Sequence, residues 1–259
     1  MKKIWALSSL LLASSTLFAG GFYAGVSGGY QILTNSIGGI GNEFEADDGV
    51  NSYLYSNDFS ATTEGSGIIG SLFLGYEQAF ANKWMLGVEF NAEVMNNHDK
   101  QYDSGQLVHN TIPRIAIING YISASEDVAL GITVRPGLLF KNSARIYGIL
   151  GYEAGRFIAG DSYLLQEFAD LTAFSASTGH KWLNGFRYGL GTQFDVSERL
   201  ALRLEINETQ YSKVESGPYY NLSNGLPESG SIAFKFRTTE TSLGLVYKFD
   251  QPTLAVSTK

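Results

Sequence analysis

Strict alternation of apolar and polar residues recurs along the chain and is its strongest structural signal. A strand that turns one face to lipid and the other to a barrel lumen needs this period of two. The alternating stretches are residues 21–32, 66–78, 84–95, 128–140, 145–157, 183–194, 199–211 and 236–249. Each is long enough to cross a bilayer as a tilted strand, which takes about 9–11 residues. The pattern therefore predicts eight transmembrane strands.

The connections between these strands alternate in length. The short ones are residues 79–83, 141–144 and 195–198, and the long polar ones are residues 33–65, 96–127, 158–181 and 212–235. Membrane barrels have short periplasmic turns and long extracellular loops. The sequence thus predicts an all-β, closed, up-and-down antiparallel barrel with both termini on the periplasmic side.

The segment 111–122 is too apolar for a plain loop, because it contains five isoleucines. Two interpretations are open: it extends the fourth strand above the membrane, or it forms a surface hairpin. A further strand hidden in a second loop would raise the count to ten, which is the alternative architecture.

The alternation also assigns each residue to a face. The outward set contains Leu243, Leu245, Tyr247 and Phe249, then Leu200, Leu202, Leu204 and Ile206, then Phe186, Tyr188, Leu190 and Phe194. The inward charged set contains Glu77, Glu89, Glu93, Glu153 and Glu205 with Arg135, Arg187, Arg203 and Lys248. No mid-strand charge is expected to face lipid. Isolated buried ions cost several kcal/mol, so we expect an ion-pair network that fills the narrow lumen as a plug rather than a conduction path.

The first residues have the pattern of an export signal. Lys2 and Lys3 precede an apolar stretch at 4–12 and a small-residue-rich stretch at 13–19, with cleavage expected after Ala19. A membrane-anchoring helix is the alternative, but the apolar stretch is shorter than the ~20 residues that a span needs. The expected organisation is a signal peptide at 1–19, a barrel at 20–249 and a short periplasmic tail at 250–259.

Composition narrows the class of protein further. The chain has no cysteine, so disulfides do not hold it together. Its net charge of −7 argues against a nucleic-acid partner. Beyond the signal there is no run of 18 apolar residues, which excludes a helical membrane bundle. The 30 glycines, 15 tyrosines and 16 phenylalanines are typical of membrane barrels with tight interiors and aromatic girdles.

Four segments carry a family resemblance: FYAGVSGGY at 22–30, GITVRPG with ARIYGILGYEAG within 131–155, LALRLEIN at 200–207 and SLGLVYKF at 242–249. They resemble the small outer-membrane barrels grouped with OmpX, Ail and the transmembrane domain of OmpA. The resemblance implies the outer membrane of a Gram-negative bacterium. It also implies an assembly signal at Ser242, Gly244, Tyr247 and Phe249, with the barrel-assembly machinery and periplasmic chaperones as partners.

The residues do not form a catalytic pattern. All three histidines, His98, His109 and His180, fall in predicted loops, and the best pairing of a histidine with an acid is His180 with Asp161 or Asp170. A hydrolase needs a nucleophile and base in contact. The acids Glu43, Glu45, Asp47 and Asp48 do not match the spacing of a calcium loop. We therefore expect no catalysis, no cofactor and no metal site.

The long loops are the best candidates for a function, because a rigid scaffold presents them. They carry many aromatic residues, which suit recognition and would equally suit packing of the loops as a cap over the barrel. The expected role is structural or surface-interacting, such as adhesion to a host or cell-surface ligand. Outer-membrane lipid and lipopolysaccharide are further expected partners, the latter through Arg156, Lys181 and Lys213 near the outer rim. The alternatives are a lipid A-modifying enzyme and a small diffusion pore.

Overall fold

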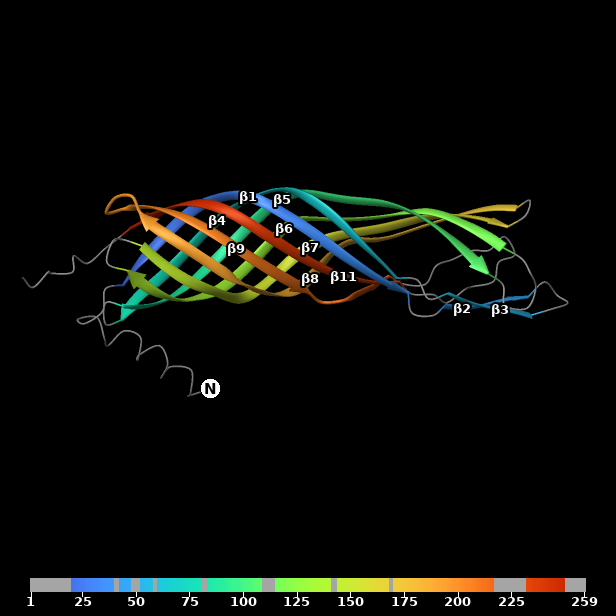
Figure 1. The fold of residues 1–259 in the computed structure, drawn as a ribbon, viewed down its shortest axis with the longest axis horizontal. Coiled ribbons are helices and arrows are strands. Elements are labelled where there is room, and N and C mark those ends of the chain that lie inside the picture. The colour runs from blue at the N-terminus through green and yellow to red at the C-terminus, as the bar shows by residue number, and fades with distance from the viewer. Residues whose placement is uncertain are drawn as a thin grey trace, which may run out of the picture.

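Long antiparallel strands make up nearly all of the described chain in the computed structural model (Figure 1). The structure describes the backbone of residues 20–39, 42–47, 52–57, 60–80, 83–108, 115–140, 144–167, 170–216 and 232–249. It describes side chains within residues 20–36, 62–80, 83–97, 123–140, 144–158, 180–214 and 233–249. The expected signal peptide and tail lie outside these residues.

Eight of the described strands form the barrel, and three short ones accompany them. The barrel strands are β1 (Gly20–Gly39), β4 (Ser60–Phe80), β5 (Trp84–Val108), β6 (Ile115–Phe140), β7 (Ala144–Glu167), β8 (Asp170–Asp195), β9 (Leu200–Tyr211) and β11 (Ile232–Lys248). The short strands are β2 (Asn42–Asp47), β3 (Ser52–Asn57) and β10 (Val214–Ser216). The predicted count of eight barrel strands is confirmed, and the barrel is not the ten-stranded alternative.

The barrel is closed because its first and last strands pair with each other. Each strand is hydrogen-bonded to the next in chain order, and β1 pairs with β11 in a register that places Tyr23 opposite Lys248. The ladder within the barrel therefore has no free edge, as a structure surrounded by lipid requires. The predicted antiparallel meander is confirmed. No helix in the described residues is long and apolar enough to cross a membrane.

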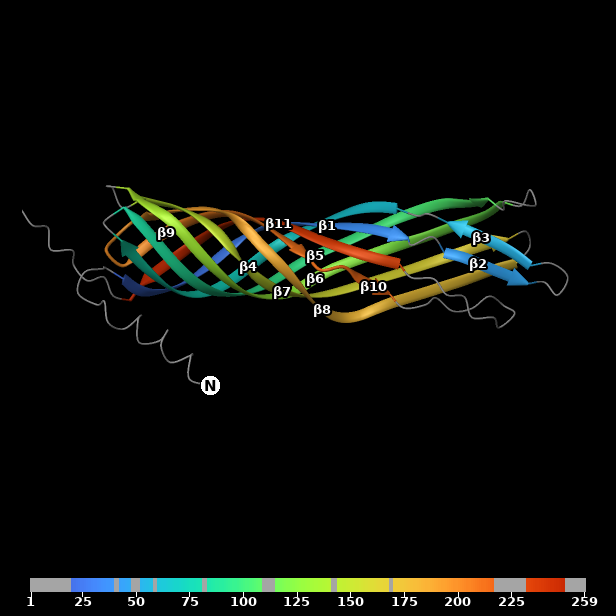
Figure 2. The ribbon, with the colours of Figure 1, turned by 90° about the horizontal axis from the view of Figure 1, so that it is seen from below.

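The two ends of the barrel differ strongly. At one end, called here the turn end, β8 and β9 are joined by a tight turn in which Val196 and Ser197 N–H groups donate to the carbonyl of Leu200. At the other end, called the long-strand end, the strands run on well past the barrel (Figures 1 and 2). Much of the sequence expected as long loops is thus strand. In particular, β6 begins at Ile115, so residues 115–122 of the apolar segment extend the fourth barrel strand, while residues 109–114 lie outside the description.

The barrel wall splits into two sheets at the long-strand end. Pairing of β4 with β5 ends at Ser66 opposite His98, and pairing of β8 with β9 ends at Gly185 opposite Tyr211. Beyond these points β5, β6, β7 and β8 continue together as a four-stranded sheet, called here the projecting sheet. Register shifts lie between Val94 and Asp99, Glu126 and Val128, and Ile158 and Gly160. Bulges bend strands, and these three lie where the barrel becomes the open sheet.

The predicted faces are confirmed along the barrel strands. On β9 the burial alternates residue by residue, with Leu202 and Leu204 exposed and Arg203 and Glu205 buried. The same alternation on β8 and β11 exposes leucine, tyrosine and phenylalanine side chains on the outer surface. An outward band of apolar side chains is the surface that faces lipid in membrane barrels.

Glu208 and Arg237 lie on the outward face near the long-strand ends of predicted strands, although no mid-strand charge was expected to face lipid. Glu208 follows Ile206 on the outward face of β9 and is only partly buried. The Tyr188 hydroxyl donates to its carboxylate at 2.5 Å and the Gln210 amide at 3.0 Å. These donors replace part of the hydration that the charge loses near lipid.

A charge in the middle of the apolar band tests the lipid-facing assignment. Leu190 is 63% exposed there, so Leu190→Arg should lower the free energy of unfolding in phospholipid vesicles by about 2–4 kcal/mol. Asn184→Arg, three outward positions nearer the long-strand end of β8, is the matched control and should cost about 0–1 kcal/mol. Denaturant titration followed by tryptophan fluorescence measures both. Equal costs would show that the band is placed at the wrong height.

Candidate functional site in the barrel interior

The lumen is filled by charged side chains arranged in three layers, numbered here from the turn end, and by an apolar cluster beyond them. The inward residues of the ladder are small or polar at most positions, so long charged side chains from opposite walls can meet near the barrel axis. Several ion pairs join strands that are not neighbours in the wall, such as β6 with β9 and β5 with β8 and β9, so the interior braces one part of the wall against another.

The first layer lies at the turn end and is balanced in charge. Arg145 pairs with Glu77 and with Asp195, the latter at 3.0 Å to each carboxylate oxygen. Lys248 Nζ lies 2.5 Å from Asp195. Two acids thus face two bases, and this layer ties β4, β7, β8 and β11 together.

The second layer is also balanced and is more deeply buried. Arg135 pairs with Glu89 at 2.5 Å and with Glu205. Arg203 donates to the other oxygen of Glu89 at 2.7 Å. The Tyr147 hydroxyl donates to Glu205 at 2.6 Å. Nearly every charged atom of the layer is therefore paired, which is the condition under which buried ions are tolerated.

Aromatic rings line the second layer and explain several inward glycines. The guanidinium of Arg203 lies 4.3 Å from the ring centre of Phe73 and 5.3 Å from that of Tyr23, as cation–π contacts. The Tyr147 ring occupies the place where a side chain at Gly191 would begin, so any larger residue there would overlap the ring. Inward glycine is thus required by close packing at this point.

The third layer has more acids than bases. Arg187 contacts three carboxylates: Glu93 at 2.6 Å, Glu153 at 2.5 Å and Glu240. Its Nε donates to the Asn207 amide oxygen at 3.0 Å. All five side chains are buried. Among the described residues, one guanidinium is therefore shared by three carboxyl groups, whereas acids and bases are equal in number in the first two layers.

Glu126 adds a further acid at the long-strand side of the third layer. The Tyr211 hydroxyl contacts it at 2.6 Å and also contacts Glu153. The Gln31 amide donates to the other Glu126 oxygen at 3.2 Å, and the Glu126 N–H donates to the Asn97 side chain at 2.8 Å. Within the described part of the chain, the hydrogen-bond partners of this carboxyl are neutral groups.

An apolar cluster, called here the apolar cap, closes the lumen beyond the third layer. Its buried members are Leu33, Ala124, Phe157, Leu183, Tyr211, Phe234 and Phe236. Phe157 stacks on Phe236 at 4.6 Å between ring centres and meets Tyr211 edge-on at 4.7 Å. Such packing excludes water from the third layer on this side.

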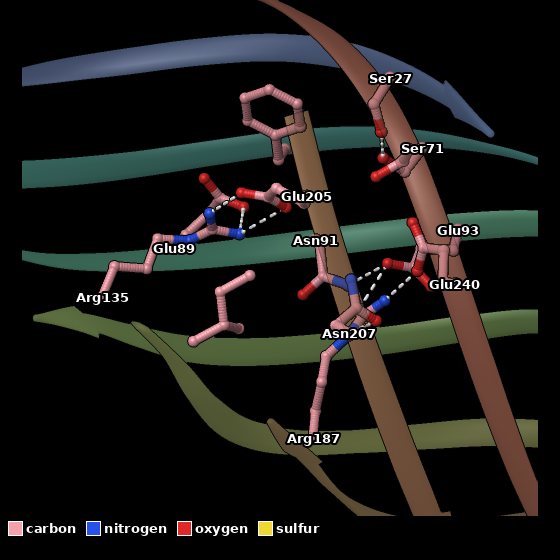
Figure 3. Close-up of a pocket in the computed structure, with 13 residues that line it drawn as sticks. Ser27, Ser71, Glu89, Asn91, Glu93, Arg135, Arg187, Glu205, Asn207 and Glu240 are labelled. Carbon is pink, nitrogen blue, oxygen red and sulfur yellow. Dashed lines mark hydrogen bonds and ion pairs between the residues drawn. The ribbon is translucent and has the colours of Figure 1, made fainter. Parts of the chain in front are cut away.

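A small cavity lies between the second and third layers (Figure 3). Its volume is about 10 Å³, which is room for about one water molecule. Figure 3 shows Arg135 with Glu89 and Glu205 on one side of it, and Arg187 with Glu93 and Glu240 on the other. The lumen is consequently packed rather than open.

The structure brings all nine predicted lumen charges into the interior, where each makes at least one ion pair with another interior charge. Four more charged residues join them. Arg145, Asp195 and Glu240 lie in or next to predicted strands, and for Arg145 and Glu240 the alternation already implies an inward direction. Glu126 could not be found this way, because the bulge between Glu126 and Val128 reverses the alternation of β6.

The residues of the expected assembly signal lie in the second half of β11 and at Phe249, the residue that follows it. Ser242 and Gly244 face inward, while Tyr247 and Phe249 face outward with their rings 5.4 Å apart. The Phe249 N–H donates to the carbonyl of Phe22 at 3.0 Å, so this end of the strand is held against β1.

A polar pair bounds the outward apolar band on β6 and β7. Arg156 donates to Asp127 at 2.6 and 2.9 Å, and these hydrogen bonds lower the pKa of the Asp127 carboxyl. His180 is exposed nearby and also favours the charged Asp127.

The side chains of the other expected polar candidates lie outside the described residues. These candidates are His98, Asp161, Asp170 and the acids at 43–48. For His109 the backbone is outside the description as well. Among the described residues no group of three or more histidine, cysteine or acidic side chains could hold a metal ion.

The sequence profile of the outer membrane protein beta-barrel domain family matches residues 5–249. The chain belongs to this family. The resemblance to small outer-membrane barrels is thus confirmed, and the chain is an outer-membrane protein. No curated protein is a significant match to it.

Solved structures similar to this outer-membrane barrel are distant in sequence. Ail of Yersinia pestis is 15% identical over 88% of this chain and 99% of its own, with a TM-score of 0.34. OprG from Pseudomonas aeruginosa is 15% identical over 88% and 96%, with a TM-score of 0.49. The outer membrane protease OmpT from Escherichia coli is 11% identical over 88% and 97%, with a TM-score of 0.29. They are too distant to carry an argument about activity.

Removing one arginine from the second layer tests the cross-bracing of this outer-membrane barrel. Arg135→Met leaves Glu89 and Glu205 with Arg203 alone, so the free energy of unfolding should fall by about 3–5 kcal/mol. Arg156→Met removes an arginine whose pair is exposed and should change stability little. Urea unfolding of both variants in vesicles measures the difference, and similar losses would mean that the interior pairs do not brace the barrel.

Proposed function

We propose that this protein is a non-catalytic surface-interaction protein, in which a closed barrel anchors a projecting sheet that binds a ligand on a host or neighbouring cell. The observation that carries the proposal is the projecting sheet itself. Its strands continue from the barrel without a break, so the binding element is held by the ladder rather than by a flexible loop.

The projecting sheet offers two strand edges within the described residues. Over residues 99–108, β5 pairs with β6 and no longer pairs with β4, because the β4–β5 pairing ends at His98. β8 pairs with β7 over residues 170–177 and reaches β9 only from Gly185 onward. Unpaired strand edges present backbone N–H and C=O groups that can pair with an extended segment of another protein. The strand edges therefore favour a protein ligand that has an accessible strand.

The orientation that suits this role places the turn end in the periplasm and the projecting sheet outside the cell. Short turns on the periplasmic side are the rule for bacterial barrels. In this orientation the export signal at 1–19 is removed, the tail at 250–259 stays in the periplasm, and Ser242, Gly244, Tyr247 and Phe249 serve the assembly machinery and its chaperones.

The packed interior favours an anchor over a pore. The paired layers and the apolar cap fill the lumen, and the cavity between the layers has room for only about one water molecule. The guanidinium of Arg156 is already paired with Asp127, which argues against a dedicated role for Arg156 in binding lipopolysaccharide.

Shortening the projecting sheet while keeping the barrel tests the proposal. Residues 100–123 and 161–176 are replaced by Gly-Ser turns, cutting each hairpin just beyond the paired residues Asp99–Ala124 and Gly160–Ser177. Bacteria displaying the intact protein should bind host cells or extracellular-matrix proteins, and the shortened variant should lose this binding. Heat-shifted gel mobility checks that both barrels fold. Binding that survives the shortening, or that the intact protein never shows, would contradict the proposal.

A further inference from the structure

Tyr211 joins two buried carboxyl groups through a single hydroxyl. Its Oη lies 2.6 Å from Oε1 of Glu126 and also contacts Oε1 of Glu153. A phenol hydroxyl has one proton, which it can direct at only one of these two oxygens. An ionised carboxylate has no proton to donate in return. One of the two contacts therefore needs a protonated carboxyl group that donates to the tyrosine oxygen.

The amides around Glu126 show which of its oxygens is the acceptor. The Glu126 N–H donates to Oδ1 of Asn97 at 2.8 Å, and the amide nitrogen of Asn97 donates to Oε1 of Gln31. The nitrogen of Gln31 then donates to Oε2 of Glu126 at 3.2 Å. Oε2 thus accepts a hydrogen bond, while Oε1 meets the tyrosine hydroxyl. This arrangement suits a neutral carboxyl group, with Oε2 as its carbonyl oxygen and Oε1 as its hydroxyl.

The surrounding charges indicate which of the two carboxyl groups holds the proton. Glu153 lies 2.5 Å from the guanidinium of Arg187, which favours its ionised form. Within the described chain, the hydrogen-bond partners of Glu126 are neutral. The other charged members of the layer, Glu93 on β5 and Glu240 on β11, are acids that share Arg187. An ionised Glu126 would therefore add a fourth negative charge around one guanidinium.

Water has little access to these carboxyl groups. Glu126, Tyr211 and Glu153 are 1–3% exposed, and the apolar cap, to which Tyr211 belongs, covers them on the long-strand side. Burial next to neutral partners favours the neutral form of a carboxyl group. Burial and the count of protons around Tyr211 thus point to the same side chain.

We infer that Glu126 is a proton-binding site of the folded barrel: at neutral pH its carboxyl group keeps its proton and donates it to Tyr211, which donates in turn to Glu153. The donors run in one direction, from β6 through β9 to the ion pair between β7 and β8. Glu126 also borders the bulge of β6, where the barrel becomes the projecting sheet. The proton is therefore part of this junction, and its loss at high pH weakens the junction.

Glutamine at position 126 tests the proton, because its amide copies a neutral carboxyl group but not an ionised one. In Glu126→Gln the amide nitrogen donates to Tyr211 and the amide oxygen accepts from Gln31, so each side-chain hydrogen bond is kept. In the unfolded intact chain, Glu126 loses its proton above about pH 4.3. The folded intact barrel then binds one proton more than the unfolded chain, so its stability falls as the pH rises.

Urea unfolding of both proteins in phospholipid vesicles gives their folding equilibrium constants. Between about pH 5 and pH 7 the constant of the intact protein should fall about tenfold per pH unit relative to that of Glu126→Gln. Glu77→Gln is the matched control, because it removes an acid that is paired with Arg145 in the first layer. It should lower stability by a factor that stays nearly constant over this range.

Infrared spectroscopy detects the proton directly. The difference spectrum of the intact protein minus Glu126→Gln at neutral pH should contain the carbonyl band of a protonated carboxyl group. Three results would overturn the inference: a ratio of folding constants that does not change with pH, failure of Glu126→Gln to fold, or absence of the carboxyl band. Each would mean that Glu126 is ionised in the folded barrel.

Discussion

The pairing of β1 with β11 is the contact on which the rest of the structure depends. Lipid offers no hydrogen bonds to the backbone, so a sheet in the membrane must close on itself. Closure at eight strands sets the width of the lumen, and a lumen of this width is filled by side chains from its own walls. The charged layers, the inward glycines and the apolar cap all follow from that width.

Closure also explains why the two ends of the molecule differ. Within the apolar band every strand needs both neighbours, whereas beyond it water can satisfy a free edge. The wall is therefore able to open between β4 and β5 and between β8 and β9, and the bulges lie near this transition. The projecting sheet is a continuation of the barrel wall beyond the lipid, where a strand no longer needs a partner on both sides.

Alternation was enough to predict the part of the chain that contacts lipid. There each residue faces either hydrocarbon or a polar lumen, so Leu202 and Arg203 differ in chemistry as well as direction. It was not enough beyond the band, where both faces of a strand can be polar; residues 99–108 therefore read as a loop although they are strand. The inward position of Glu126 was not predicted for a different reason: a bulge reverses the inward–outward alternation of side chains without any marker in the sequence.

Ion conductance through single molecules in planar lipid bilayers is the measurement that shows whether the lumen is closed by its own side chains. The layers of ion pairs and the apolar cap predict a flat baseline at moderate voltage, with no stable open level. Steady openings on the nanosiemens scale would contradict the account, because they require a continuous aqueous path through the space occupied by Arg135, Arg187 and Phe157.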